Sequence, residues 1–189
     1  MTPSPEDQLT ALDMVAAALA QEDDRSAVYR AAEEALQCLV GHRLFTLLAV
    51  HPAGDEVQRF WSSNEADYPL TGRKRLGSTP WGDVVLRDRR PWLGRDRAAI
   101  MWAFADHELI ERLGLGSAIN IPVMIHGRLL GTINLLHSEG HFKEAHLQIA
   151  ARIAPYLAPA LAAEIRAIET GMPSAIPSGN PVTRPARAV

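Results

Sequence analysis

Two apolar segments joined by a two-residue link constrain the fold of this chain more than any other feature. They cover residues 118–125 and 128–137, and His126-Gly127 separates them. A two-residue link that contains glycine is typical of a tight hairpin turn, so the segments are predicted to pair as antiparallel strands. The chain therefore needs an antiparallel sheet, with other elements packed on it.

The segments before this hairpin predict two helices and a second hairpin. Apolar residues recur every three or four positions over 6–21 and over 26–40, and Gly41 stands where helices commonly end. Residues 44–50 form a short apolar run, and alternating residues follow it at 57–62 after a Pro-Ala-Gly-Asp turn. The first half of the chain thus predicts two helices followed by two strands.

Two longer segments flank the central hairpin. Residues 64–116 mix Pro, Gly, aromatic and charged residues with only short helical patterns. Partly irregular segments of this length are often the binding regions of compact domains. Residues 142–169 carry an apolar stripe that predicts one long helix, with Pro155 and Pro159 as interruptions or kinks.

Length and composition fit one domain with short ends. The chain has 189 residues, of which 47% are hydrophobic and 22% charged, enough to build a buried core. We expect a flexible N-terminus over 1–5, a single domain over 6–169 and a disordered Pro-rich tail over 170–189.

Charge and hydropathy exclude several classes of partner. The formal net charge is −3, which leaves no basic excess to neutralise the phosphates of a nucleic acid. The acidic start of the sequence has no secretory signal, and the apolar runs are shorter than the roughly 20 residues of a membrane span. We expect a cytoplasmic protein that binds neither nucleic acid nor membrane.

The single cysteine and the histidines predict no catalytic or metal centre. Cys38 has apolar neighbours and is predicted to be a small buried hydrophobe. His137, His141 and His146 are spaced by four and five residues across a strand end, a turn and a helix start. This spacing differs from that of helical zinc ligands, so we expect polar surface histidines and no metal site.

Three stretches near the end of the sequence resemble the closing signature of GAF domains. They are Ser-Ala-Ile-Asn-Ile-Pro-Val at 117–123, Gly-Arg-Leu-Leu-Gly-Thr-Ile-Asn-Leu at 127–135 and Phe-Lys-Glu-Ala-His-Leu at 142–147. The resemblance implies an α+β, GAF/PAS-like antiparallel sheet. It also implies that the first two helices and the long C-terminal helix cover one face, while the 64–116 segment forms a ligand pocket on the other.

The resemblance implies a sensing role, although one fold does not fix one function. We expect a stand-alone, small-molecule-binding sensory or regulatory domain. It would signal in trans to a separate output protein, or through a homodimer formed by the first and last helices. One alternative is a protein–protein interaction module with a degenerate pocket. The other is a redox enzyme of the free methionine sulfoxide reductase type.

Cofactor chemistry is not supported by the residues present. The reductases carry pocket cysteines where this sequence has residues 79–81 and 115–117, and Cys38 lies elsewhere. Cys38 does not supply the thioether cysteine of a bilin site either, and no particular histidine is favoured as a haem ligand. We therefore expect no enzyme activity and an unidentified small metabolite as ligand.

Two carboxamides are the main candidate ligand contacts. By the resemblance, Asn120 faces the ligand with Ala118 on the first central strand, and Asn134 does so with Thr132 on the second. A carboxamide both donates and accepts, so the pair can read the edge of an amide, imide or heterocycle. Alternatively, the two side chains bond only to each other or to water.

A helix start and several aromatic residues complete the predicted site. Thr79 is predicted to be an N-cap, with Pro80 as the first helical residue and Trp81 next. A helix start favours a carboxylate or carbonyl oxygen. Further aromatic candidates for stacking a flat ligand are Trp61, Tyr68 and Trp102. Together these residues predict a planar ligand that is neutral or anionic.

Overall fold

The structure is a computed structural model that describes residues 3–20, 25–51, 56–70, 73–75, 79–170 and 172. In chain order the elements are α1 (Pro5–Leu19), α2 (Arg25–Leu39), β1 (Leu44–Val50), β2 (Glu56–Ser62), β3 (Arg73–Arg75), the short wide helix η1 (Gly82–Arg87), β4 (Trp92–Gly94), α3 (Arg97–Ala103), α4 (His107–Arg112), β5 (Ser117–Ile125), β6 (Arg128–His137), α5 (Glu144–Ala151) and α6 (Ala154–Thr170). The predicted tail, apart from Thr170 and Met172, and the predicted turn at 52–55 lie outside the described residues.

The strands form one antiparallel sheet. Its order is β3-β2-β1-β6-β5-β4, so the predicted central hairpin, β5 and β6, lies beside β1. His126 and Gly127 form the turn with φ values of 46° and 74°. Positive φ at both central residues is the geometry of the tight hairpin turns that match strand twist.

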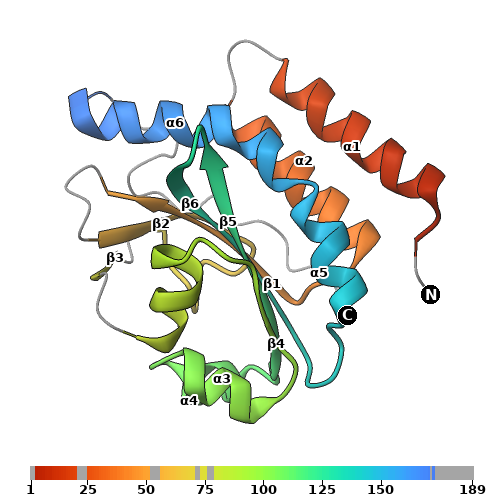
Figure 1. Cartoon of the computed structure of the whole chain (residues 1–189), viewed down its shortest axis with the longest axis vertical. Helices are drawn as coiled ribbons and strands as arrows, with labels where there is room; N and C mark the ends of the chain where they lie inside the picture. Colours follow the sequence, from red (N-terminus) through yellow and green to blue (C-terminus); the bar gives the residue numbers. More distant parts are fainter. Residues whose placement is uncertain are drawn as a thin grey trace.

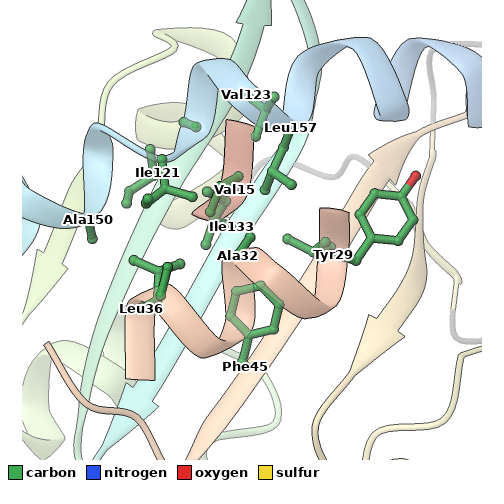
Figure 2. Close-up of a cluster of buried hydrophobic side chains, with 14 of the residues drawn as sticks. Val15, Tyr29, Ala32, Leu36, Phe45, Ile121, Val123, Ile133, Ala150 and Leu157 are labelled. Atoms are coloured by element: carbon green, nitrogen blue, oxygen red, sulfur yellow. The ribbon is translucent and has the colours of Figure 1, made fainter. Parts of the chain in front are cut away.

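Helices cover both faces of the sheet, with different roles. α2, α5 and α6 pack on one face with α1 outside them, and η1, α3 and α4 lie against the other (Figure 1). Figure 2 shows the main core between the sheet and the first group, where Leu36 of α2 and Leu157 of α6 meet Ile133 of β6. The predicted α+β arrangement of an antiparallel sheet with helices packed on it is confirmed.

The predicted long C-terminal helix is in fact two helices. α5 ends at Ala151 and α6 begins at Ala154. The break lies just before Pro155, because proline has no N–H to bond the carbonyl of Ala151 and its ring clashes with that carbonyl in a continuous helix. Pro159 lies inside α6 without ending it.

Two further observations concern the first residue of α1 and the ability of the described helices to span a membrane. Ser4 caps α1 through a capping box with Asp7, so the helix begins at Pro5, within the segment predicted to be flexible. None of the described helices has the length and apolar character needed to span a bilayer.

Cys38 is exposed, which corrects the prediction of a buried thiol. The buried residues of α2 recur every three or four positions and include Leu36 and Leu39. Cys38 lies between these two in sequence, and a helix turns about 100° per residue, so its side chain leaves the buried face. Apolar neighbours in sequence are therefore not neighbours in space here.

Candidate functional site

A cavity of about 440 Å³ lies on the face of the sheet that η1, α3 and α4 cover. Strands β1, β2, β5 and β6 contribute its floor, while η1, the segment 103–106 and Ile110 of α4 contribute the opposite wall. Most of its surface is apolar. This size and composition are typical of small-molecule sites.

Two carboxamides lie in the cavity floor, and both are buried. Asn120 Nδ2 donates to Asn134 Oδ1 at 2.6 Å, and Asn134 Nδ2 lies 3.3 Å from both the carbonyl oxygen and Oγ1 of Thr46. A backbone carbonyl only accepts, so it fixes the orientation of Asn134 and, through it, that of Asn120. The two amides therefore bond to each other. Asn120 Oδ1 is a buried acceptor that has no partner among the described residues.

A buried arginine on β2 lines the same cavity. Arg59 is 8% exposed, its Nη1 donates to the carbonyl oxygen of Pro69 at 3.0 Å, and its guanidinium carbon lies 4.9 Å from the centre of the Tyr68 ring. Burial lowers the pKa of Arg59, and the charges of Tyr68 and Asp106 oppose that shift. An arginine remains cationic under such shifts, so the cavity contains a desolvated positive charge whose Nε has no partner.

Tyr68 adds a hydroxyl donor to this side of the cavity. Burial, followed by the negative charge of Asp106, raises the pKa of Tyr68, so its phenol keeps the proton. Tyr68 is buried, at 6% exposure, and its hydroxyl has no hydrogen-bond partner among the described residues. Tyr68 is one of the predicted aromatic contacts that the structure does place in the cavity wall.

The predicted helix start at Thr79 is also present. Thr79 Oγ1 accepts from the Gly82 N–H at 3.0 Å, and the turn that follows runs into η1. This cap uses the Gly82 N–H, and Pro80 has no N–H, so the helix start offers a ligand little beyond its side chains. Trp81 lines the cavity beside Phe104, at a ring distance of 6.1 Å, and its Nε1 has no partner.

Four residues of this cavity therefore carry buried polar atoms that no described group satisfies. Three of the atoms belong to donors, and one is an acceptor: Arg59 Nε, Tyr68 OH, Trp81 Nε1 and Asn120 Oδ1. Buried polar groups in folded proteins nearly always have partners, because an unmade bond costs about 1–3 kcal/mol. Their gathering around one cavity is suited to a ligand with complementary polar groups.

A protein-family comparison identifies the fold. The family model of the GAF domain matches residues 21–162. The chain belongs to the GAF domain family.

Solved structures of GAF domains superpose on most of this GAF domain. That from a phosphoenolpyruvate-protein phosphotransferase of Coxiella burnetii has a TM-score of 0.71 at 17% identity, over 89% of this chain and 99% of the other. A free methionine-R-sulfoxide reductase from Neisseria meningitidis, in complex with its substrate, gives 0.65 at 17% identity over 91% and 97%. A two-component sensor histidine kinase domain from Bacillus halodurans gives 0.62 at 12% identity over 73% and 93%.

At these identities the likeness shows the fold alone. No curated protein matches the sequence. The residues of the cavity therefore have to carry the functional argument for this GAF domain.

Trp61, one of the predicted aromatic contacts, does not line the cavity. β1 pairs Leu48 with Arg59 and Leu47 with Trp61, so Phe60 is an extra residue in β2, a β-bulge. The bulge turns Trp61 to the helix-covered face, where its Nε1 donates to Glu33 Oε2 at 2.8 Å. Trp61 is thus part of the contact between α2 and the sheet.

Three other predicted residues lie near the cavity but not in its wall. Ala118 and Thr132 are fully buried in the sheet, and Thr132 Oγ1 has no partner. Trp102 is 49% exposed and stacks on Trp92 at a ring distance of 6.1 Å. Of the nine predicted contacts, the structure brings five together: Asn120, Asn134, Thr79, Trp81 and Tyr68.

Sequence reasoning missed Arg59 and Asp106. Arg59 has Phe60 and Trp61 as its next neighbours, and a charged residue within a strand that is otherwise buried is the signal that could have found it. Asp106 lies just before α4 and faces the cavity only because the chain turns there.

The three histidines cluster at the far end of β6. The rings of His137 and His141 stack at 3.5 Å, and that of His146 lies 5.6 Å from His141. All three are half-buried, so the prediction of surface histidines is wrong in this respect. Among the described residues, no group of three or more His, Cys, Asp or Glu side chains is placed to hold a metal ion.

Proposed function

We propose that this GAF domain is a small-molecule-binding sensory or regulatory domain whose ligand occupies the cavity between the sheet and the η1–α4 segment. The observation that carries the proposal is the set of four unpartnered buried polar atoms around a cavity of about 440 Å³. An interior that served only as a core would leave such atoms bonded or replace them with apolar groups.

The related folds support a sensing role. One similar domain belongs to a two-component sensor histidine kinase and another to a methyl-accepting chemotaxis protein. Both names describe proteins that convert a stimulus into an output.

We also propose that binding occurs without turnover. Sulfoxide reduction of the kind named for the similar Neisseria protein needs a thiolate nucleophile. Cys38 is the only cysteine of this chain, and it is exposed on α2, a helix that packs on the opposite face of the sheet from the cavity. The one cysteine thiol of the chain is therefore not placed to react with a molecule in the cavity.

α3 offers a route from the cavity to a partner protein. Ala103 of this helix lines the cavity, while Met101 and Trp102 are 61% and 49% exposed. A ligand that shifts α3 moves Ala103 in the cavity wall together with the exposed Met101 and Trp102. The same exposed residues favour the second candidate function, an interaction module whose cavity takes no ligand.

A homodimer is the other proposed route for the signal. The apolar stripe of α6 packs within the chain, because Leu157, Leu161 and Ile165 are buried against the sheet. On α1, Leu9 is 60% exposed and Met14 37%. We therefore place the proposed dimer contact on α1, and Leu9→Glu is expected to convert a dimer to a monomer in sedimentation.

Thermal-shift screening with a filled cavity tests the proposed function. Ala103→Phe places a ring in the cavity wall, and Ala98→Phe places the same ring on an exposed position of α3. A metabolite that binds in the cavity raises the melting temperature of the wild type and of Ala98→Phe, but not that of Ala103→Phe.

Two results would contradict the proposal. One is that no compound among amino acids, aromatic acids, heterocycles and nucleotides stabilises the wild type, which favours the interaction module. The other is that every stabilising compound acts equally on Ala103→Phe, which places binding outside the cavity.

A further inference from the structure

Two of the residues with unpartnered polar atoms, Arg59 and Asn120, stand on strands at opposite sides of the cavity floor. Arg59 is on β2 and Asn120 is on β5, and β1 and β6 lie between them in the sheet. Neighbouring strands are about 4.8 Å apart, so about 14 Å of sheet separates the two backbones. The cavity floor runs across all four strands.

The β2 end offers donors. Tyr68 lies against the Arg59 guanidinium, and Trp81 packs with Leu48 of β1 and Val57 of β2. Arg59 Nε, Trp81 Nε1 and the Tyr68 hydroxyl all carry hydrogen, and the first belongs to a full positive charge. Acceptor atoms with negative charge complement this end.

The β5 end offers an acceptor. The chain of bonds from the Thr46 carbonyl through Asn134 directs the Asn120 Nδ2 group into the pair, and Oδ1 is left over. An N–H or O–H group complements this atom. A second acceptor there would face the lone pairs of Oδ1.

The charges of the described lining residues favour an anionic group with one negative charge. Arg59 is the only cation among the described residues that line the cavity, and Asp106 lines it as well. Asp106 is less buried than Arg59 and offsets part of its charge. A monoanionic carboxylate balances what remains, whereas a phosphate dianion exceeds it.

We infer that the cavity takes a small aromatic acid, with its carboxylate toward Arg59 and an N–H or O–H group toward Asn120. The cavity surface is mostly apolar and includes the Trp81 and Phe104 side chains, which suit a flat ring. This inference rests on the proposed function and gives its ligand a chemical class and an orientation.

A matched series of 4-hydroxyphenyl compounds tests it. The acids are 4-hydroxybenzoate, 4-hydroxyphenylacetate and 3-(4-hydroxyphenyl)propionate, which place the carboxylate at increasing distances from the hydroxyl. Their amides remove the charge, 4-hydroxybenzylamine and tyramine reverse it, and the 4-methoxy acids remove the donor. Affinity for the intact chain is measured by calorimetry.

The expected result is a preference for at least one acid. Its amide binds about 10- to 100-fold more weakly, because a charged hydrogen bond to a desolvated arginine is lost. The methoxy acid binds about tenfold more weakly, because Asn120 Oδ1 loses its donor. The amines bind most weakly.

Variants of the protein distinguish the effect of the Arg59 charge on ligand affinity from a general effect on folding. Arg59→Gln is expected to weaken the acid about 10- to 100-fold and to bring the acid and its amide within about threefold of each other. Arg59→Lys restores part of the preference. Ala98→Phe keeps the wild-type affinities, and melting temperatures identify any variant that fails to fold.

Several results would overturn the inference while the proposed function stands. They are a preference for the amines, equal binding of acid and amide, or a ligand from the broader screen in the cavity when none of the acids binds. Failure of both the series and the broader screen would overturn the inference and the proposed function together.

Discussion

Asn120 and Asn134 lie directly opposite each other on β5 and β6, and Asn120 donates to Asn134 at 2.6 Å in the floor of the cavity. The same alternation that buries one face of these strands directs both amides into the other. Because Thr46 fixes the pair, the cavity receives one oriented acceptor and not two freely rotating amides.

A double-mutant cycle on the two amides measures this bond. Asn120→Leu and Asn134→Leu each leave a buried polar partner unsatisfied, so each is expected to lower the free energy of unfolding by about 1–3 kcal/mol. The double variant is expected to lose less than the sum, with a coupling of about 0.5–3 kcal/mol. Urea denaturation gives all four values, and strictly additive losses would contradict the bond.

Gly131→Ala is expected to destabilise the fold strongly. A Cβ at this position of β6 would collide with the carbonyl oxygen of Leu48 and lie 2.7 Å from Cδ2 of Leu161. Neither β1 nor α6 can withdraw without opening the core, so the loss is expected at about 3 kcal/mol, the upper end for overpacking.

Gly127→Ala is the matched control for that variant. Gly127 has a φ of 74°, but a Cβ added there would meet no atom within 4 Å. Its loss therefore reflects backbone conformation alone, about 1 kcal/mol. Equal losses for the two variants in denaturation would rule out the close packing of β6 between β1 and α6.

Acid is expected to weaken the fold through its histidine cluster. Burial, then the positive charges of His141, Arg43 and His42, lower the pKa of His137 to about 4. Burial is also the largest cause of the lowered pKa values of His146 and His42. The folded state thus favours neutral rings, and below about pH 6.5 the unfolded chain binds protons that the folded chain does not.

Stability is therefore expected to be complete above about pH 6.5 and to fall as the pH drops toward about 4. Melting temperatures measured from pH 7.5 to 4.5 check the direction. His137→Gln is expected to make the dependence shallower, because it removes the ring with the strongly lowered pKa that is stacked on His141. Stability that rises on acidification would contradict this account of the cluster.

Cys38 is expected to react in the native state. Its side chain is exposed on α2, so a maleimide reagent reaches it without unfolding. Labelling followed by mass spectrometry is expected to give one adduct per chain at the same rate in buffer and in mild denaturant. Protection that is lost only on unfolding would restore the buried position that the sequence predicted.

The helices and strands that have a clear periodicity were predicted from the sequence. Features that depend on how the strands pair were missed. Alternation along β5 and β6 predicted which residues share a face with Asn120 and Asn134, and the resemblance to GAF domains predicted that these faces meet the ligand. Plain alternation along β2 puts Arg59 and Trp61 on one face, but the bulge at Phe60, which appears only in the register between β1 and β2, separates them. The face of each residue was therefore not predictable from the sequence.

The 64–116 segment shows the other limit of sequence reasoning. Its helices are short, since α3 has seven residues and α4 has six, and such lengths give no clear amphipathic period. Their places depend on contacts distant in sequence. The Thr79 cap was predictable because its signal is local.

The most direct test of ligand binding in the cavity uses the side-chain N–H signals of the cavity residues in ¹⁵N-labelled protein. The compound with the largest thermal shift is added to saturation, and the Trp81 indole, Arg59 Nε–H and Asn120 amide signals are compared with the Trp61 indole, which is bonded to Glu33 on the opposite face. We predict that the three cavity signals move while the Trp61 signal keeps its position. Movement of the Trp61 or Trp102 signals with the cavity signals unchanged would contradict a ligand-binding role for this cavity.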